Sequence, residues 1–333
     1  MTKILVTGGA GFIGAHVTDR LIKLNHEVLV VDSLKTIGGI PFINRKCKFL
    51  KGDITSKATL KKIKKWRPKI IFHLAAQSCS ETAYDNPKED YLSNGMGTYL
   101  LALLAKEIKV KYFIYTSSVS VYGSKLKNNI TEKSTIEPDS IYGISKYAGE
   151  MFIRQVLYKT KIKTAIFRIF NTYGPGENLN FLRKGMVSIF CGYFWKKKPI
   201  IVKGSLKRFR DFNYIDDCAK ILTNTIINKK LKKNDLFNLS AGKSFTVKKL
   251  ISEILKINNK SRYPIKIQTG TQGDSFGYHA SNKYLRNNRG IFVFSDPAAE
   301  NSILAIIDML IASNKIAGID FLIYGITDSL TLS

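Results

Sequence analysis

The sequence predicts an α/β fold in which a doubly wound parallel sheet is joined to a smaller C-terminal domain. Three observations predict this fold. The chain opens with a short apolar run, a glycine-rich turn and an amphipathic segment, in that order. Further apolar runs of strand length recur along the first 170 residues, with room for a helix between them. A length of 333 residues allows one large domain or two, with an ample core.

The first predicted strand is the apolar run of residues 3–7, which suits a buried parallel strand. Gly8, Gly11 and Gly14 follow it, and then a helical pattern begins. In such a turn the first glycine permits the tight bend, the second lets the backbone approach a pyrophosphate, and the third allows close helix packing. The spacing differs from the commonest dinucleotide fingerprint, so a purely structural turn stays open as an alternative.

The second predicted strand ends at Asp32, which lies 18 residues after Gly14. A carboxylate at this place accepts hydrogen bonds from the adenosine ribose and repels a 2′-phosphate, which favours NAD over NADP. The next apolar run ends at Asp53. That acid has two interpretations, a contact with the adenine amino group or the N-cap of the following helix.

Three later apolar runs end in small or polar residues. Ligands of doubly wound sheets bind at the carboxyl ends of the strands, so we expect these residues to share one site. His73, inside an apolar run, is interpreted as a packed core residue rather than a base. The strand ends are Leu74-Ala75-Ala76, Ser117-Ser118 and Phe170-Asn171.

Tyr142 and Lys146 lie four residues apart and would share one face of a helix. An ammonium held there can lower the pKa of the phenol and make it a useful base. The spacing alone means little in a lysine-rich chain with 16 tyrosines. The glycine turn, Asp32 and Ser118 give it weight.

With these motifs in this order, the sequence resembles the extended short-chain dehydrogenase/reductase family, specifically its NAD-dependent nucleotide-sugar epimerases and dehydratases. The resemblance covers roughly residues 1–285. The matching segments are Thr7–Gly14, Asp32, Asp53, His73–Ala76, Asn94, Thr116–Gly123, Tyr142–Lys146, Arg168–Pro175 and Arg208–Asp217.

The resemblance implies a Rossmann-type NAD-binding domain over residues 1–170, to which segments near 211–240 return. Residues 171–333 would form mainly the substrate domain, with an atypical tail over 291–333 that carries a net charge of −4. It further implies NAD as the cofactor and a nucleotide-diphosphate sugar as the substrate. A cytoplasmic homodimer that serves polysaccharide biosynthesis is the matching expectation.

The resemblance also implies roles for individual residues. Tyr142 would take a proton from a sugar hydroxyl, Lys146 would bind the nicotinamide ribose and lower the tyrosine pKa, and Ser118 would hydrogen-bond the reacting oxygen. Ser117 is the fallback for Ser118. The implied cofactor contacts are Gly8, Gly11, Phe12, Ile13, Gly14, Asp32, Asp53, Ile54, Leu74, Ala75, Ala76, Asn94, Tyr142 and Lys146. The implied substrate contacts are Ser118, Asn171, Arg210 and Asp274.

Val119 and Ser120 bear on the reaction. Dehydratases of the family carry Asp-Glu at these two positions, and neither Val119 nor Ser120 can act as an acid or base for elimination. Their presence favours epimerisation at carbon-4 through a transient keto sugar. The alternatives are a dehydratase or net oxidoreductase of the same family, and a non-catalytic dinucleotide-binding sensor.

Composition argues against other classes. The net charge of +28 is spread over scattered lysines without a basic stripe interleaved with aromatic residues, so no nucleic-acid partner is expected. No apolar run approaches the roughly 20 residues of a membrane span. The four cysteines have no metal-ligand spacing, so we expect reduced thiols and no metal site.

Overall fold

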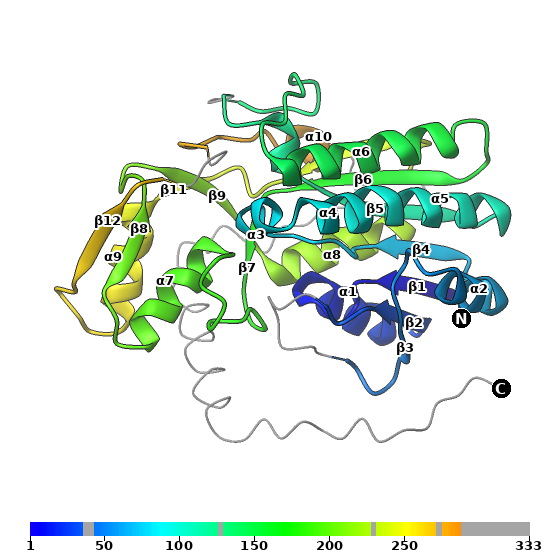
Figure 1. The fold of residues 1–333 in the computed structure, drawn as a ribbon, viewed down its shortest axis with the longest axis horizontal. Coiled ribbons are helices and arrows are strands. Elements are labelled where there is room, and N and C mark those ends of the chain that lie inside the picture. Colours follow the sequence, from blue (N-terminus) through cyan, green and yellow to red (C-terminus); the bar gives the residue numbers. More distant parts are fainter. Residues whose placement is uncertain (36–42, 126–128, 228–230, 271–274, 288–333) are drawn as a thin grey trace.

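The computed structural model describes residues 1–35, 43–125, 129–227, 231–270 and 275–287 (Figure 1). Asp274 and the tail 291–333, about which the sequence made predictions, lie outside these residues. The described chain forms a large part built on a seven-stranded sheet and a smaller part built on two short sheets.

The large sheet is entirely parallel, in the order β10-β6-β5-β4-β1-β2-β3. Strands β1, β2 and β3 extend the sheet in one direction, and β4, β5 and β6 extend it in the other. The strand order therefore reverses between β1 and β4, where doubly wound sheets bind their ligands. The predicted doubly wound fold is confirmed. The strands are β1 (Lys3–Thr7), β2 (Glu27–Asp32), β3 (Lys48–Lys51), β4 (Ile70–His73), β5 (Tyr112–Ser118), β6 (Lys163–Ile169) and β10 (Asp235–Leu239).

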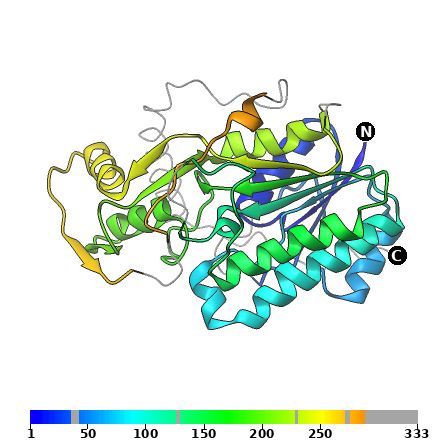
Figure 2. The same cartoon turned by 90° about the horizontal axis from the view of Figure 1, so that it is seen from above.

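Helices cover both faces of this sheet, which is why its central strands are apolar on both sides (Figure 2). On one face, α1 (Phe12–Lys23) packs against α8 (Ile215–Ile227). On the other face lie α2 (Lys57–Trp66), α5 (Gly97–Glu107) and α6 (Ile141–Val156). Each face has its own apolar core, and together they fix the strand ends that line the site.

The smaller part has a third apolar core between helices and short sheets. Its three-stranded sheet has the order β11-β9-β7, and β12 pairs with β8 in a second sheet. The elements are β7 (Asn171–Tyr173), α7 (Met186–Trp195), β8 (Ile200–Lys203), β9 (Phe209–Tyr214), β11 (Ser244–Thr246), α9 (Val247–Ile257) and β12 (Ile265–Gln268). The remaining short helices are α3 (Ser80–Asp85), α4 (Pro87–Asp90), η1 (Tyr91–Met96), η2 (Val119–Tyr122) and α10 (Lys283–Asn287).

The chain passes between the two parts several times. The predicted boundary near residue 170 falls between β6 and β7. After β9 the chain returns to the large part, where α8 packs on α1 and β10 pairs with β6. It then leaves again through β11 and α9. No helix within the described ranges combines the length and apolar character needed to cross a membrane.

Candidate active site

A pocket of about 800 Å³ runs from the carboxyl ends of the large sheet to the smaller part. Both parts contribute to its lining, from the glycine turn after β1 to the first turns of α7. Because the sheet reverses its strand order beside this pocket, the pocket lies where a doubly wound fold is expected to bind a ligand.

The glycine turn forms one end of the pocket. Gly8 has φ of +69°, and a Cβ added to it would lie 2.6 Å from the backbone nitrogen of Ala75. A Cβ on Gly14 would collide with the carbonyl of Gly8. Helix α1 begins here without a capping side chain on Gly11, so its first amide donors suit a phosphate group. The turn therefore has the shape and donors of a pyrophosphate cradle.

The two predicted acids follow in the same wall. The Asp32 carboxylate accepts hydrogen bonds from the backbone nitrogens of Ala10 (3.1 Å) and Leu34 (2.9 Å), which fix its position at the end of β2. Asp53 also lines the pocket, and its carboxylate accepts from Lys35 Nζ at 2.7 Å. The N-cap of α2 is Ser56, so the N-cap interpretation of Asp53 is wrong.

His73 lies behind this wall as a core residue, as predicted. It is fully buried, and its two ring nitrogens lie 2.7 Å from Thr7 Oγ1 and 2.8 Å from Thr98 Oγ1. Both nitrogens are thus occupied. Other predicted cofactor contacts that line the pocket are Phe12, Ile13, Ile54, Leu74, Ala75 and Ala76.

Ser118, Tyr142 and Lys146 meet in the middle of the pocket. Ser118 ends β5, and its Oγ accepts a hydrogen bond from the backbone nitrogen of Ser120 at 3.1 Å. Tyr142 and Lys146 lie in the first turns of α6, which is capped by the Ser140 hydroxyl. The structure therefore brings Ser118, at the end of β5, together with Tyr142 and Lys146 of α6.

The electrostatics of this trio differ from the expectation. Burial raises the pKa of Tyr142 to about 12, although a hydrogen bond with Ser118 acts in the opposite direction. Burial also lowers the pKa of Lys146 to about 7, and its Nζ lies 4.4 Å from the centroid of the Tyr115 ring. In the described chain desolvation determines the direction of both shifts, and a lowering of the Tyr142 pKa by Lys146 stays a prediction.

A buried ion pair supports the trio from behind. The Arg168 guanidinium donates to both carboxylate oxygens of Glu150, at 2.9 and 2.7 Å. Ser117 Oγ donates to the same carboxylate at 2.6 Å. Glu150 lies one helical turn after Lys146, so this contact joins α6 to the ends of β5 and β6. The Ser117 hydroxyl is occupied, which favours Ser118 over its fallback.

Asn94 does not reach the pocket surface. It is fully buried, and its amide nitrogen lies 3.0 Å from the Gln77 carbonyl and 2.9 Å from Ser145 Oγ. Gln77 Nε2 in turn donates to the buried Asp90 carboxylate at 2.6 Å. This arrangement places Asn94 where it supports the loop after β4, and a direct cofactor contact stays a prediction.

Two predicted substrate residues line the far half of the pocket. Asn171 donates to the Tyr278 hydroxyl at 2.9 Å. The Arg210 guanidinium is buried and donates to the carbonyls of Ser275 (2.7 Å) and Phe276 (3.2 Å). Through these two hydrogen bonds, Arg210 holds the backbone of Ser275 and Phe276 beside the pocket. Asp274, the remaining predicted substrate contact, lies outside the described residues.

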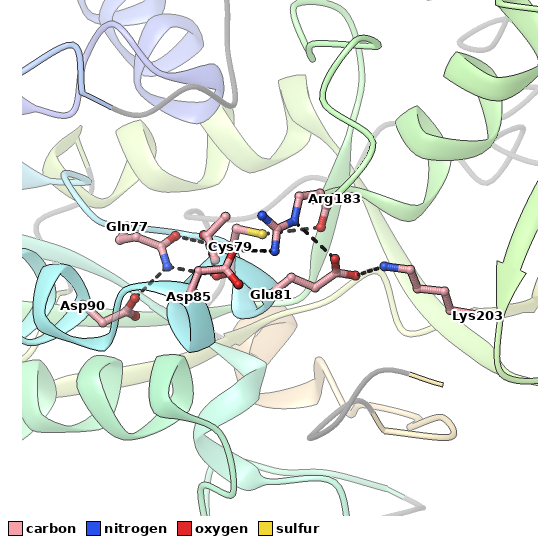
Figure 3. A network of polar contacts seen from close by, with 8 residues as sticks. Gln77, Cys79, Glu81, Asp85, Asp90, Arg183 and Lys203 are labelled. Atoms are coloured by element: carbon pink, nitrogen blue, oxygen red, sulfur yellow. Dashed lines mark hydrogen bonds and ion pairs between the residues drawn. The ribbon is translucent and has the colours of Figure 1, made fainter. Parts of the chain in front are cut away.

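The sequence did not reveal a set of ion pairs that joins the two parts across the pocket (Figure 3). Glu81 and Asp85, on α3, face Arg183 and Lys203 of the smaller part. Glu81 lies 2.6 Å from Lys203 Nζ and 3.4 Å from Arg183 Nε, and Arg183 Nη2 lies 2.6 Å from Asp85. About 100 residues separate the partners in sequence, so no local sequence motif predicts these ion pairs.

No cluster of His, Cys, Asp and Glu suited to a metal ion was found within the described ranges. The pocket as a whole combines the glycine turn, the Asp32 carboxylate and the trio of Ser118, Tyr142 and Lys146. The lining contributed by the smaller part, with Asn171 and Arg210, faces them. This combination suits transfer of a proton at a sugar hydroxyl beside a bound dinucleotide.

Comparison with known proteins agrees with this geometry. Residues 4–240 match the model of the NAD dependent epimerase/dehydratase family. A putative UDP-glucose 4-epimerase of Methanocaldococcus jannaschii is 34% identical over 252 residues, which are 75% of this chain and 81% of that protein. The dTDP-D-glucose 4,6-dehydratase of Homo sapiens is 28% identical, over 77% of this chain and 73% of that protein.

The fold is also shared with solved structures. The UDP-glucose 4-epimerase of Thermotoga maritima, solved with UDP-glucose, superposes with a TM-score of 0.84 at 26% identity. The superposition covers 95% of this chain and 99% of the other.

Proposed function

Because the chain belongs to the NAD dependent epimerase/dehydratase family, we propose that it epimerises a nucleotide-diphosphate sugar at carbon-4. One observation carries the proposal. Ser118, Tyr142 and Lys146 share a single pocket with the glycine turn and Asp32. The similarity to UDP-glucose 4-epimerases in both sequence and structure supports the same reaction.

NAD is the cofactor, and the pocket residues fit it. The glycine turn and the first amides of α1 would hold the pyrophosphate. Gly8 lets this turn pack closely on the backbone of Ala75, and Gly14 lets α1 begin against the Gly8 carbonyl. The fixed carboxylate of Asp32 would accept the ribose hydroxyls. Bound in this cradle, NAD would supply the acceptor, and then the donor, of a hydride exchanged with the sugar carbon.

Tyr142 and Ser118 would handle the proton of the reacting hydroxyl. Ser118 orients the oxygen, and Tyr142 takes up its proton and later gives it back. Burial favours the neutral phenol of Tyr142, so removal of its proton requires positive charge nearby. Lys146, one turn along the same helix, would supply that charge in its protonated form.

Val119 and Ser120 favour epimerisation over dehydration. Both lie in η2 at the edge of the pocket, and neither side chain carries an acid. Elimination of water from the sugar needs an acid and a base beside the reacting carbons. Some relatives are dehydratases, but the absence of an acid at positions 119 and 120 favours epimerisation for this chain.

Incubation with a panel of UDP-, GDP-, CDP- and dTDP-sugars tests the proposed function. We expect one sugar to be converted to its carbon-4 epimer without added NAD, because the cofactor is regenerated in each turnover. Product stereochemistry by NMR and product mass are the measurements. A product lighter by one water, or stoichiometric accumulation of NADH, would identify a dehydratase or an oxidoreductase instead.

Replacing Asp32 with alanine is expected to reduce the preference for NAD over NADP by about tenfold, which corresponds to roughly 1.4 kcal/mol. The reason is that the carboxylate both accepts the ribose hydroxyls and repels a 2′-phosphate. Calorimetric dissociation constants for the two dinucleotides measure the change. Asp216→Ala, an exposed acid outside the pocket, is the control. An unchanged ratio in the Asp32 variant would show that this residue does not contact the ribose.

We also propose that the enzyme is a homodimer whose subunits meet through α5 and α6. Leu103, Met151 and Phe152 are exposed apolar residues on these two helices, and Phe152 packs on the Tyr99 ring. Burying them against a second copy would remove apolar surface from water. Sedimentation velocity measures the oligomeric state, and a monomer at micromolar concentration would contradict the proposal.

We place the enzyme in the cytoplasm, in the supply of sugars for polysaccharide biosynthesis. All four cysteines are free thiols, as is usual in reducing compartments. Cell fractionation followed by immunodetection tests the location.

A further inference from the structure

Lys184 differs from two of the other lysines that line the pocket, Lys35 and Lys203. Lys35 and Lys203 each lie within hydrogen-bond distance of a carboxylate, at 2.7 Å from Asp53 and 2.6 Å from Glu81 respectively. Each of these charges is thus balanced at short range. The four lysines in the lining are Lys35, Lys146, Lys184 and Lys203.

The Lys184 ammonium has a neutral partner instead. Its Nζ donates to Ser78 Oγ at 2.6 Å, and no carboxylate of the described chain lies within ion-pair distance of it. A hydroxyl satisfies one of the three donors of an ammonium group and carries no charge. Burial lowers the pKa of Lys184, which reflects the cost of holding this charge away from water.

Glu177 is the carboxyl group whose charge acts on Lys184. Burial raises the pKa of Glu177 to about 8, although the charge of Lys184 acts in the opposite direction. Its Oε2 is buried and has no hydrogen-bond partner among the described residues. Because Lys184 Nζ forms no ion pair with Glu177 in the described chain, the ammonium retains electrostatic attraction for an anion.

Lys184 lies where the smaller part meets the loop that follows β4. It directly precedes Gly185, the N-cap of α7, and its side chain crosses to the loop that follows β4. Cys79, next to Ser78 in that loop, is near enough to influence the pKa values of both Tyr142 and Lys184. Figure 3 shows Cys79 beside Arg183, the residue before Lys184. Lys184 and Tyr142 line the same pocket, so an anion bound by Lys184 would share that pocket with Tyr142.

We propose that Lys184 is a substrate-binding residue whose ammonium pairs with an anionic oxygen of the nucleotide sugar. The inference rests on the proposed function, which supplies an anionic substrate. Two parts of such a substrate present the same chemistry, the diphosphate and a carboxylate carried by the sugar. A lysine ammonium binds either as a point charge.

The test compares Lys184→Met with Lys207→Met, which removes an exposed lysine of the smaller part that lies outside the pocket lining. Both are made in NAD-loaded protein that also carries Tyr142→Phe, so that substrate is not consumed. Calorimetry measures the binding of UDP, UDP-glucose and UDP-glucuronate. We expect Lys184→Met to weaken binding about 10- to 100-fold and Lys207→Met by less than about threefold.

The three ligands distinguish the two sources of negative charge. An equal loss for all three assigns the contact to the diphosphate, and a loss for UDP-glucuronate alone assigns it to a sugar carboxylate. Either result supports the proposal. Unchanged binding of all three ligands overturns it.

Lys184→Gln separates charge from the structural contact with Ser78, and it replaces the methionine variant if that protein does not fold. Glutamine keeps a hydrogen-bond donor but no charge, so we expect the same loss of binding. Binding equal to that of the parent protein would show that the contact with Ser78, not the ammonium charge, is what matters, and would overturn the proposal.

Failure of this inference is distinct from failure of the proposed function. If the parent protein binds the ligands and every Lys184 variant matches it, only the role of Lys184 is wrong. If the parent protein binds none of the three ligands, the proposed UDP-sugar chemistry fails and the inference fails with it.

Discussion

Replacing Tyr142 with phenylalanine is expected to lower kcat by about 10²- to 10⁴-fold, the usual range for loss of a general acid or base. NAD should remain bound, because the glycine turn and Asp32 that form its cradle lie on other elements. The change removes only a hydroxyl and keeps the buried ring, so the fold should be preserved. Steady-state kinetics and the NAD content of the purified protein are the measurements.

Tyr147→Phe is the matched control for Tyr142→Phe. Tyr147 lies on the same helix but outside the pocket lining, where it packs against a separate apolar cluster. We expect its kcat to stay close to that of the parent enzyme. Near-normal turnover of the Tyr142 variant would remove Tyr142 from the reaction.

Replacing Glu150 with alanine is expected to lower the free energy of unfolding by about 3–5 kcal/mol. The substitution leaves the buried Arg168 guanidinium without its carboxylate and takes the acceptor from Ser117. A loss of this size should lower Tm by about 5–15 °C, which differential scanning calorimetry measures. Turnover should also fall, since Glu150 joins the helix of Tyr142 to the strand of Ser118.

The double variant Glu150→Leu with Arg168→Leu tests the cause of that loss. If an uncompensated buried charge is responsible, removing both charges should recover most of the stability. A single Glu150→Ala variant with an unchanged Tm would contradict the interpretation. A double variant less stable than Glu150→Ala would show that the two side chains contribute packing rather than charge balance.

The large sheet could be predicted because its signals are local. Strands β1, β2 and β4 to β6 are apolar runs that end in small or polar residues, and Gly8 marks a turn with φ of +69°. The two-stranded sheet of the smaller part was harder to predict from the sequence. Strands β8 and β12 are four residues long and pair across more than 60 residues, and β12 is exposed throughout. Only tertiary contacts define such a pair.

The site was predictable to a similar extent. Sequence motifs identified Ser118, Tyr142 and Lys146, which the structure brings into one pocket. The direction of the Tyr142 pKa shift was not predictable, because it depends on how deeply the folded chain buries the phenol. Glu150 and Lys184 were missed because their partners, Arg168 and Ser78, are defined by folding and not by spacing.

Because the chain returns to the large sheet at β10, the N-terminal half cannot be expected to fold as a separate fragment. A fragment that ends at residue 170 would lose β10 and α8, leaving β6 as an unpaired edge strand and one face of α1 uncovered. Such a fragment should aggregate. The segment between β7 and β9, by contrast, enters and leaves at fixed points. Its length and side chains can change while the cofactor sheet stays intact, so new sugars can be accommodated around unchanged chemistry.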